Sequence, residues 1–337
     1  MMVARSVKRI WAVFKARNLE YLRDRASFGW NLIFPVLIVL ALAVVFSGPP
    51  QGIFSITYLG TEEARPALLA FPGIETVETT DESRALDRLA RQQTDMVITV
   101  TDGAVRYWVN GYSAAGALTE QLLKFSESRP LISGRTEGDG IRYIDWVIPG
   151  ILGMNMMYSA LWGVGYVVVR YRQAGYLKRL KATPLTKFEF LSAQVMSRVM
   201  VTLSASTIVF VGTNLLLEYK MVGSVWLLLL IALIGALSMI TMGLAIASRT
   251  ESKEFADGLL NALTFPMLLL SEVWFSLEGS PEWVQWIAMT LPLTHMLDAA
   301  RAVMLDDAGL WEIAPHLGVL LIFCGVGMAI STRLFKW

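Results

Sequence analysis

The stretch from Asp145 to Arg170 reads DWVIPGILGMNMMYSALWGVGYVVVR, and no Asp, Glu, Lys or Arg occurs between its two ends. About 20 apolar residues in a helix cross a hydrocarbon core of roughly 30 Å, so this segment is long enough to span a bilayer. A second candidate, Gly258 to Leu277, contains Glu272 as its one charged residue. Four more stretches are free of charged residues, between Arg25 and Glu62, Arg198 and Glu218, Lys220 and Arg249, and Glu312 and Arg333. The sequence therefore predicts a mainly α-helical, polytopic membrane protein with six transmembrane helices.

The composition agrees with a chain that is partly dissolved in lipid. Of the 337 residues, 55% are hydrophobic and 17% are charged, whereas a soluble domain usually carries about 25% charged residues. The net charge of +1 gives no indication of a nucleic-acid partner, and we expect none. Cys324 is the single cysteine, so an internal disulfide is excluded. No His lies at metal-ligand spacing from it. The basic N-terminus lacks the pattern of a cleaved signal peptide.

The distribution of Lys and Arg predicts the orientation, because cytoplasmic loops carry an excess of these residues. With the N-terminus inside, the cytoplasmic segments would hold eighteen of them, including seven in residues 1–25 and seven in 170–198. The short outer loops would hold only Lys220 and Arg301. The long segment after the first span is exempt, since large domains translocate regardless of charge. We therefore expect both termini to lie in the cytoplasm.

Residues 48–143 interrupt the hydropathy pattern and predict a small α+β extracytoplasmic domain. The stretches IFSITYLG (53–60) and DMVITVTDGAVRYWVNG (95–111) alternate and are rich in β-branched and aromatic residues, which is typical of strands. Asp102-Gly103 lies where a hairpin turn would. The domain could serve as a spacer or dimer contact, or it could handle substrate or dock a periplasmic partner.

Two helices are predicted within the same domain. The stretch ESRALDRLARQQ (82–93) places Leu86 and Leu89 on one face. The stretch AAGALTEQLLKFSES (114–128) does the same with three apolar residues, so we expect that face to pack on the sheet. The three residues are Leu118, Leu122 and Phe125.

Residues 1–25 place apolar side chains among basic ones, which predicts an amphipathic helix along the inner leaflet, ahead of a first transmembrane helix at 26–47. The cytoplasmic loop 170–198 is patterned as a helix, a turn and a second helix. The first helix should stop before Thr183-Pro184, because the residue before proline is pushed out of the α region. Thr186 with Glu189 three residues later forms a capping box that would start the next helix. Such a loop offers a surface to a cytoplasmic partner.

Residues 176–191 read YLKRLKATPLTKFEFL and closely resemble the cytosolic loop of type-2 ATP-binding-cassette (ABC) exporter permeases. A second match, SPEWVQW (280–286) followed by LPLTHMLDAAR (291–301), looks like the outer re-entrant segment of that family, which would here occupy 278–311. With the six-span layout, the resemblance covers nearly all of the chain and places the second to sixth spans in 144–337. The insertion after the first span resembles the drug-export branch of the family.

The resemblance implies a permease subunit of the bacterial inner membrane that moves a drug, a lipid or a small peptide-like molecule out of the cytoplasm or the inner leaflet. Its partners would be two copies of an ABC ATPase subunit, a second copy of this chain or a related permease, membrane lipids and, as an option, a periplasmic adaptor. ATP and Mg²⁺ would bind to the ATPase, because this chain has no Gly-x-x-x-x-Gly-Lys-Ser/Thr run. No cofactor, metal or catalytic residue is expected on this chain. The alternative is a membrane-anchored scaffold or enzyme that acts through its outer domain, although His-Glu-x-x-His and nucleophile-elbow motifs are both missing.

The resemblance also assigns two sets of site residues. The coupling helix that contacts the ATPase would comprise Tyr176, Leu177, Lys178, Arg179, Lys181, Thr183, Pro184 and Leu185. The translocation path, between the second and fifth spans of two protomers, would be lined by Asn155, Met156, Tyr158, Trp162, Phe265, Met267, Glu272 and Phe275. For each apolar member, ordinary helix packing is the alternative.

Glu272 departs from the family pattern, which commonly has a small residue at that position. A carboxylate within the membrane by default marks a functional site or a paired charge. If it faced the path, Glu272 would favour cationic cargo. If it lay close enough to the surface to reach water, it would need no such role.

Overall fold

The computed structural model divides into two compact units, one formed by Met1–Ala43 with Ile144–Trp337 and the other by Val44–Tyr143. We call them the membrane unit and the sheet unit. Within them the structure describes residues 2–45, 54–60, 65–90, 93–101, 103–111, 113–136, 143–250, 252–277 and 280–336.

Four helices of the membrane unit are long and apolar enough to cross a membrane by length and composition. Even the 23-residue α8 measures about 35 Å at 1.5 Å per residue, more than a hydrocarbon core of roughly 30 Å. These helices correspond to four of the six predicted spans. They are α5 (Tyr143–Gln173), α7 (Lys187–Leu217), α8 (Val225–Ala247) and α12 (Leu310–Leu334).

The other two predicted spans correspond to helices that do not meet this test over their described residues. The apolar part of α2 (Arg25–Val45) is the shorter segment Leu32–Leu42. The helix α9 (Lys253–Leu270) starts five residues before the predicted span and ends seven residues before Leu277. The prediction rested on the absence of charge, so it omitted the polar first turns of α9. Whether these two helices cross the membrane stays a prediction.

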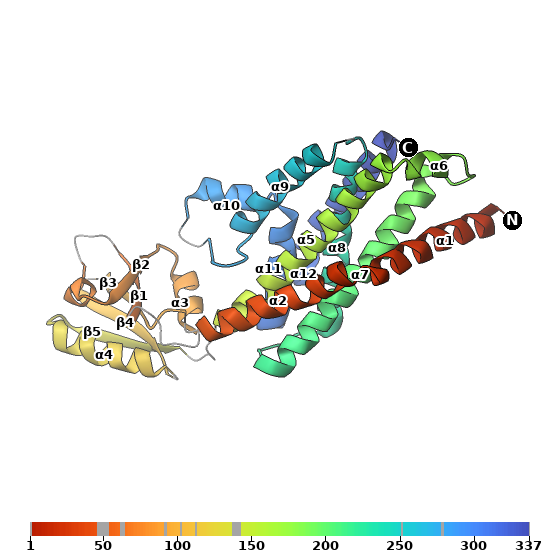
Figure 1. Cartoon of the computed structure of the whole chain (residues 1–337). Coiled ribbons are helices and arrows are strands. Elements are labelled where there is room, and N and C mark those ends of the chain that lie inside the picture. The colour runs from red at the N-terminus through yellow and green to blue at the C-terminus, as the bar shows by residue number, and fades with distance from the viewer. Residues whose placement is uncertain are drawn as a thin grey trace. The chain divides into compact units, whose positions relative to one another are not determined.

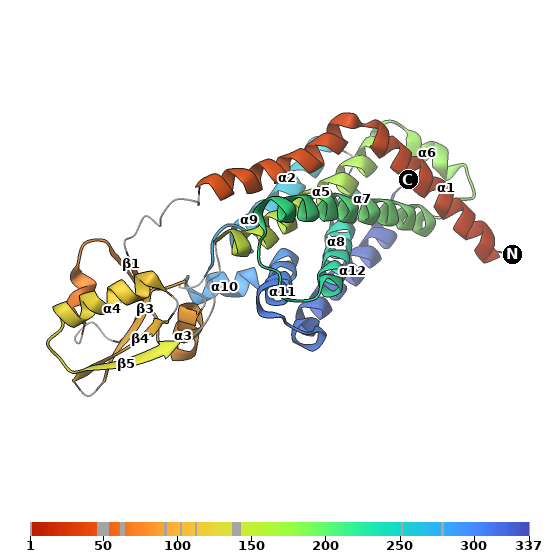
Figure 2. The ribbon, with the colours of Figure 1, turned by 90° about the horizontal axis from the view of Figure 1, so that it is seen from below.

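Four further helices are found among the described residues of the membrane unit. The N-terminal α1 is separated from α2 by Asp24, and the two helices meet at an angle (Figure 2). Along α1, the side chains of Val7 and Trp11 are exposed, and the Trp11 ring stacks on Phe14 of the same helix. The predicted re-entrant segment contains two helices, of which the second is buried along most of its length and packs against α8 and α12. The bounds are α1 (Met2–Arg23), α6 (Tyr176–Lys181), α10 (Glu282–Ala288) and α11 (Pro292–Asp306).

Arg172, in the last turn of α5, joins the ends of three helices. Its guanidinium donates hydrogen bonds to the carbonyl oxygens of Ala247 (2.8 Å), Ser248 (2.9 Å) and Lys336 (2.9 Å), at the ends of α8 and α12. These carbonyls form the negative end of the helix dipole, so a cation stabilises them. The ends of α5, α8 and α12 therefore meet on one side of the membrane unit, where α6 and both termini also lie (Figure 1).

The opposite ends of α8 and α12 carry exposed tryptophans. Trp226 is the second residue of α8, Trp311 is the second residue of α12, and both side chains are largely exposed. Tryptophan is enriched where a membrane meets water. The two helices thus have an aromatic end and a hydrogen-bonded end at Arg172, as expected for helices that run from one membrane surface to the other.

The sheet unit is a five-stranded sheet of order β2-β1-β3-β4-β5. Only β3 and β4 are antiparallel, and the other neighbours are parallel. The predicted strands and their hairpin connection are confirmed as β1, β3 and β4, with Gly103 at a φ of +77°, while Asp102 lies outside the described residues. The strands are β1 (Phe54–Leu59), β2 (Ile74–Glu78), β3 (Met96–Thr101), β4 (Ala104–Asn110) and β5 (Leu131–Thr136), with a short 3-10 helix at Ala67–Ala70 after β1.

The two predicted helices of this unit form on opposite faces of the sheet. On α3 (Glu82–Ala90), Leu89 is buried against Leu59 and Val97, and Leu86 packs at the edge of this cluster, as predicted. The other face is covered by α4 (Ala114–Ser126), whose Leu123 is buried in the main core of the sheet.

The predicted apolar face of α4 is wrong. Leu118, Leu122 and Phe125 are exposed, Phe125 to 91%, and the helix instead packs on the sheet through a stripe of Gly116, Thr119 and Leu123. The small side chains let the backbones approach, since a Cβ added at Gly116 would lie 3.0 Å from the carbonyl oxygen of Asp95. The close approach of the helix backbone to the sheet, more than hydrophobicity, therefore determines which face of α4 packs on the sheet.

Adjacent leucines of α4 give a matched test of this correction. Leu123 is fully buried, whereas Leu122 is 40% exposed. An aspartate at 123 would bury a charge without a partner, so Leu123→Asp is expected to unfold the sheet unit. Leu122→Asp should leave it folded. The measurement is limited proteolysis of the full-length protein, followed by mapping of the cuts. Equal resistance of both variants would restore the face predicted from the sequence.

Candidate functional site

A cavity of about 1080 Å³ lies in the membrane unit between α1, α2, α5, α7 and α9. It follows α5 from Arg170 to Met154, which is about 24 Å at the rise of an α-helix. Its volume slightly exceeds the range of about 300–1,000 Å³ that is usual for small-molecule pockets. The walls are mixed, with charged side chains from α1, α5, α7 and α9 and apolar ones that include Phe34, Ile38 and Leu268.

Three of the predicted path residues line this cavity, namely Asn155, Tyr158 and Trp162 on α5. They lie three or four residues apart and so share one face of the helix. Met156 on the same helix is buried in the helical core instead, because a neighbour in sequence points to a different side.

The path residues predicted from the fifth span are not brought into the cavity. Met267 is fully buried in the helical core, whereas the side chains of Phe265 and Phe275 are exposed elsewhere on the membrane unit. The cavity is lined from this part of the chain by Leu268 and Trp274.

Glu272 lies in the turn that follows α9, at a φ of +53°. Its carboxylate accepts a hydrogen bond from the backbone N–H of Leu277 (2.9 Å) and lies 3.7 Å from Nη1 of Arg301. The Arg301 guanidinium stacks 3.9 Å from the ring centroid of Trp146 and donates to the Trp146 and Glu272 carbonyl oxygens. Of the alternatives for Glu272, these contacts correspond to a paired charge.

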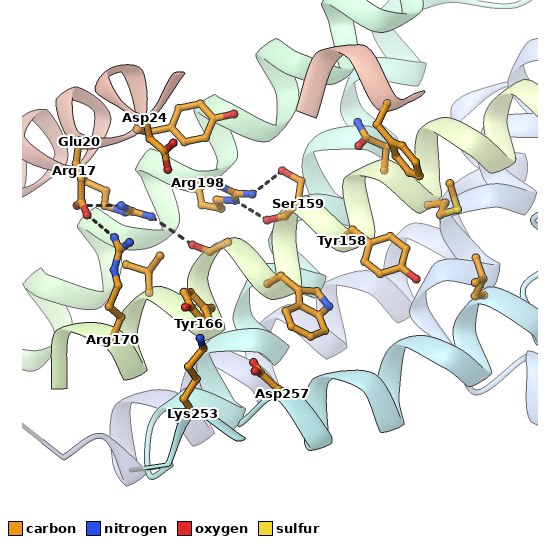
Figure 3. Close-up of a pocket in the computed structure, with 18 of the residues that line it drawn as sticks. Arg17, Glu20, Asp24, Tyr158, Ser159, Tyr166, Arg170, Arg198, Lys253 and Asp257 are labelled. Carbon is orange, nitrogen blue, oxygen red and sulfur yellow. Dashed lines mark hydrogen bonds and ion pairs between the residues drawn. The ribbon is translucent and has the colours of Figure 1, made fainter. Parts of the chain in front are cut away.

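Glu20 on α1 holds two arginines at the rim of the cavity (Figure 3). Its carboxylate accepts from Arg17 Nη1 at 3.0 Å and from Arg170 Nη2, and it also bonds the hydroxyl of Tyr171. Arg17 reaches further to the Gly163 carbonyl oxygen at 3.4 Å. These contacts join α1 to α5, and they were not foreseen because residues 1–25 were considered only as a surface helix.

Arg198 on α7 lines the cavity and is only 8% exposed. Its Nε donates to the carbonyl oxygen of Ser159 (2.5 Å) and its Nη2 donates to Ser159 Oγ (2.8 Å), as Figure 3 shows. Gly163, one turn along α5, makes room for it, since a Cβ there would lie 1.8 Å from Arg198 Cζ. Arg198 was predicted to end a cytoplasmic loop, but α7 already starts at Lys187. The predicted cap at Thr186 was the signal that could have placed Arg198 inside the helix.

The α9 side of the cavity carries Lys253 and Asp257, one helical turn apart. Lys253 Nζ lies 4.8 Å from the ring centroid of Tyr166. Two polar atoms of the cavity wall are buried without a hydrogen-bond partner in the described chain, Asp257 Oδ1 and the indole Nε1 of Trp162. A ligand with both polar and apolar parts would satisfy such a wall.

The predicted coupling helix forms α6, after a turn at Gly175 with a φ of +68° that favours glycine. It stops at Lys181, so the predicted end before Thr183-Pro184 is confirmed. Leu177 is fully buried and anchors the helix, whereas Leu185 is half-buried against the helical core and keeps part of its surface accessible. The exposed predicted residues are Tyr176, Lys178, Arg179, Lys181, Thr183 and Pro184.

The capping box predicted at Thr186 and Glu189 is confirmed, with both reciprocal hydrogen bonds present. The structure adds a second role, because the buried Glu189 carboxylate also accepts hydrogen bonds from Ser6 Oγ and Arg9 Nη2 on α1, each at 2.5 Å. The bond to Glu189 raises the pKa of Arg9 above its ordinary value. One carboxylate thus starts α7 and attaches α1 beside the exposed loop.

The sequence matches known proteins over a region that includes the cavity residues of α5, α7 and α9. The model of the ABC-2 type transporter family matches residues 103–305, more than half of the chain, so the chain belongs to that family. The inner membrane transport permease YhhJ of Escherichia coli (strain K12) is 25% identical over 268 residues, which cover 74% of this chain and 70% of that protein. The probable multidrug ABC transporter permease YbhR of the same strain is 24% identical over 192 residues, 57% of this chain and 52% of that protein.

A further relative is the daunorubicin resistance ABC transporter permease protein DrrB1 of Streptomyces coeruleorubidus, 23% identical over 200 residues, which cover 58% of this chain and 69% of that protein. The chain is therefore a transport permease and a multi-pass inner-membrane protein. Permeases of this family work with a partner ATPase subunit.

Proposed function

We propose that this chain is the permease subunit of an ATP-driven exporter for amphipathic molecules. The observation that carries the proposal is the cavity of about 1080 Å³, whose wall combines charged groups with aromatic and aliphatic side chains. The printed names of two relatives, which refer to multidrug transport and daunorubicin resistance, support a cargo of this kind. The path would then begin among Asn155, Tyr158 and Trp162.

The ATPase would dock on the loop around α6, with ATP and Mg²⁺ bound to that partner. The exposed cations Lys178, Arg179 and Lys181 stand beside exposed Thr183 and Pro184, and the buried Leu177 would transmit force to the helical core. Two permease chains and two ATPase copies would form the working complex.

The side of the membrane unit with Arg172 and α6 would face the cytoplasm, and the sheet unit would lie outside it. With α2 and α9 as further spans, the chain would cross the membrane six times. The exposed apolar face of α1 at Val7 and Trp11 supports a helix that lies in the inner leaflet. The exposed Leu118, Leu122 and Phe125 of α4 favour a contact role for the sheet unit over a spacer.

The docking surface is tested by charge reversal on α6. Arg179→Glu and Lys178→Glu should lower substrate-stimulated ATPase activity about tenfold. Each variant removes a cationic contact to the ATPase and would set a new negative charge against any acidic group on the ATPase surface. The measurement is ATP hydrolysis by the permease reconstituted with its ATPase subunit in liposomes. Arg333→Glu is the matched control, since Arg333 is an exposed cation near the end of α12, outside the loop.

Membrane insertion and the yield of folded permease should be unchanged in all three variants. If both α6 variants kept the stimulated ATPase activity of the wild type, the loop would not be the docking surface. Failure of the wild-type permease to bind or stimulate any ATPase subunit would remove the exporter function itself and favour the scaffold or enzyme alternative.

A further inference from the structure

Arg198 is a buried cation without a counter-ion. No carboxylate of the described chain forms an ion pair with it. Its Cζ lies 5.9 Å from the ring centroid of Tyr21, and the like charge of Arg17 also acts on it. Its acceptors are the neutral oxygens of Ser159. It lies eleven residues into α7, about 16 Å from the start of the helix. A buried cation without a carboxylate partner is costly, and an ionisable side chain inside a membrane helix by default marks a functional site.

None of the described acids of the cavity pairs with Arg198. Glu20 is shared by Arg17 and Arg170, and Asp257 faces the charge of Lys253 on its own helix. Asp24 also lines the cavity but makes no ion pair with Arg198. Four cations therefore line the cavity against three carboxylates, and Arg198 makes no ion pair with any of the three.

The geometry leaves two hydrogen-bond donors without acceptors. With Nε and Nη2 of Arg198 occupied by Ser159, Nη1 makes no hydrogen bond within the described residues. The indole N–H of Trp162, three residues from Ser159 on the same face of α5, is likewise without an acceptor there. Guanidinium groups bind carboxylate and phosphate oxygens strongly and with defined geometry. An anion would supply both the missing charge and the missing acceptors.

We propose that the cavity binds amphiphiles with a single anionic headgroup, a carboxylate or a phosphate, and that Arg198 recognises this headgroup. The apolar chain would lie along Ile38, Met154 and Leu268. Ser159 holds the guanidinium by two hydrogen bonds, and Gly163 leaves the room that it occupies. The proposal rests on the proposed function, because the amphiphile would be the cargo, and it reverses the cationic preference that Glu272 suggested.

Binding to the full-length permease in phosphatidylcholine nanodiscs tests the proposal without ATP or the ATPase. The probes are radiolabelled laurate and dodecyltrimethylammonium, which share a chain and differ in charge. Wild-type protein should bind laurate saturably and more tightly than the cation. Arg198→Gln should weaken laurate binding about tenfold, the loss expected for a charged hydrogen bond, and leave the cation unaffected. Arg198→Lys should recover part of the affinity, and Arg333→Gln, an exposed control, should match the wild type.

The comparison of the two probes on wild-type protein keeps the test decisive if Arg198→Gln does not fold. Tighter binding of the cation by the wild type, or equal laurate binding by wild type and a folded Arg198→Gln, would overturn the proposal. Gly163→Ala adds a variant that retains the charge but displaces the guanidinium, so it should also weaken laurate binding.

The source of the anion is separated by adding phosphatidic acid to the nanodiscs. Arg198-dependent displacement of laurate by this lipid would assign a lipid headgroup as a ligand, and absence of displacement would assign free amphiphilic acids. Laurate binding without any stimulation of an ATPase would leave the site intact while removing the exporter function. ATPase stimulation by cationic amphiphiles, with no Arg198-dependent laurate binding, would support the exporter function and overturn the anion site.

Discussion

Replacing Arg301 by alanine is expected to destabilise the membrane unit by about 3–5 kcal/mol, the range for removing one partner from a buried ion pair. Arg301 is buried, stacks on Trp146, donates to two backbone carbonyls and faces the Glu272 carboxylate at 3.7 Å. Alanine would remove these hydrogen bonds, the stacking on Trp146 and the ion pair with Glu272. The measurement is the apparent melting temperature and the monodisperse yield of the detergent-solubilised protein.

Glu272→Gln is the control for this prediction, because an amide oxygen can still accept from the Leu277 N–H. Its effect on stability should be small, and its effect on transport should be equal for cationic and neutral cargo. A melting temperature of Arg301→Ala equal to that of the wild type would contradict the structural role of the pair. A selective loss of cationic transport in Glu272→Gln would return that carboxylate to the translocation path.

The second large effect is expected at Glu189. Glu189→Ala removes the acceptor for Ser6 and Arg9 and half of the capping box at Thr186, so α1 would detach from the start of α7. Substrate-stimulated ATP hydrolysis by the reconstituted complex should fall about tenfold or more, since the exposed loop would lose its fixed position. Basal hydrolysis by the ATPase subunit alone should not change.

A double-mutant cycle separates the two contacts of Glu189. If the link to α1 matters, Arg9→Ala should reproduce most of the loss, and combining it with Glu189→Ala should add little, because contacting residues are not additive. If only the capping box matters, Arg9→Ala should behave as the wild type. Glu218→Ala, at the other end of α7, controls for loss of an acidic residue.

The parts of the structure that depend on neighbouring residues could be predicted from the sequence. The Thr186 cap, the stop before Pro184 and the strands on either side of Gly103 follow from backbone rules that act over a few residues. The apolar face of α4 could not be predicted, because Gly116 and Leu123 were selected by the sheet they approach. Packing decided between two stripes that have similar spacing on one helix.

The candidate site was foreseen only where one helix carries it. Asn155, Tyr158 and Trp162 share a face of α5 and could be grouped by helical spacing. Arg198 and Glu20 reach the same cavity from α7 and α1, and no spacing rule relates positions so far apart in the sequence. Glu272 was a visible anomaly, but its partner Arg301 lies 29 residues later and was counted only as an outer-loop charge.

The attachment of α1 has a mechanical consequence. The helix is bound beside the exposed loop through Arg9 and, eleven residues later, at the rim of the cavity through Glu20, a separation of about 16 Å along its axis. An unbroken helix is stiff over this length, so a push that displaces the loop end must shift the rim end as well. The N-terminal helix α1 thus connects the loop around α6, where the ATPase would act, to the rim of the cavity, where cargo would enter. A tilt of α1 would widen or narrow that rim.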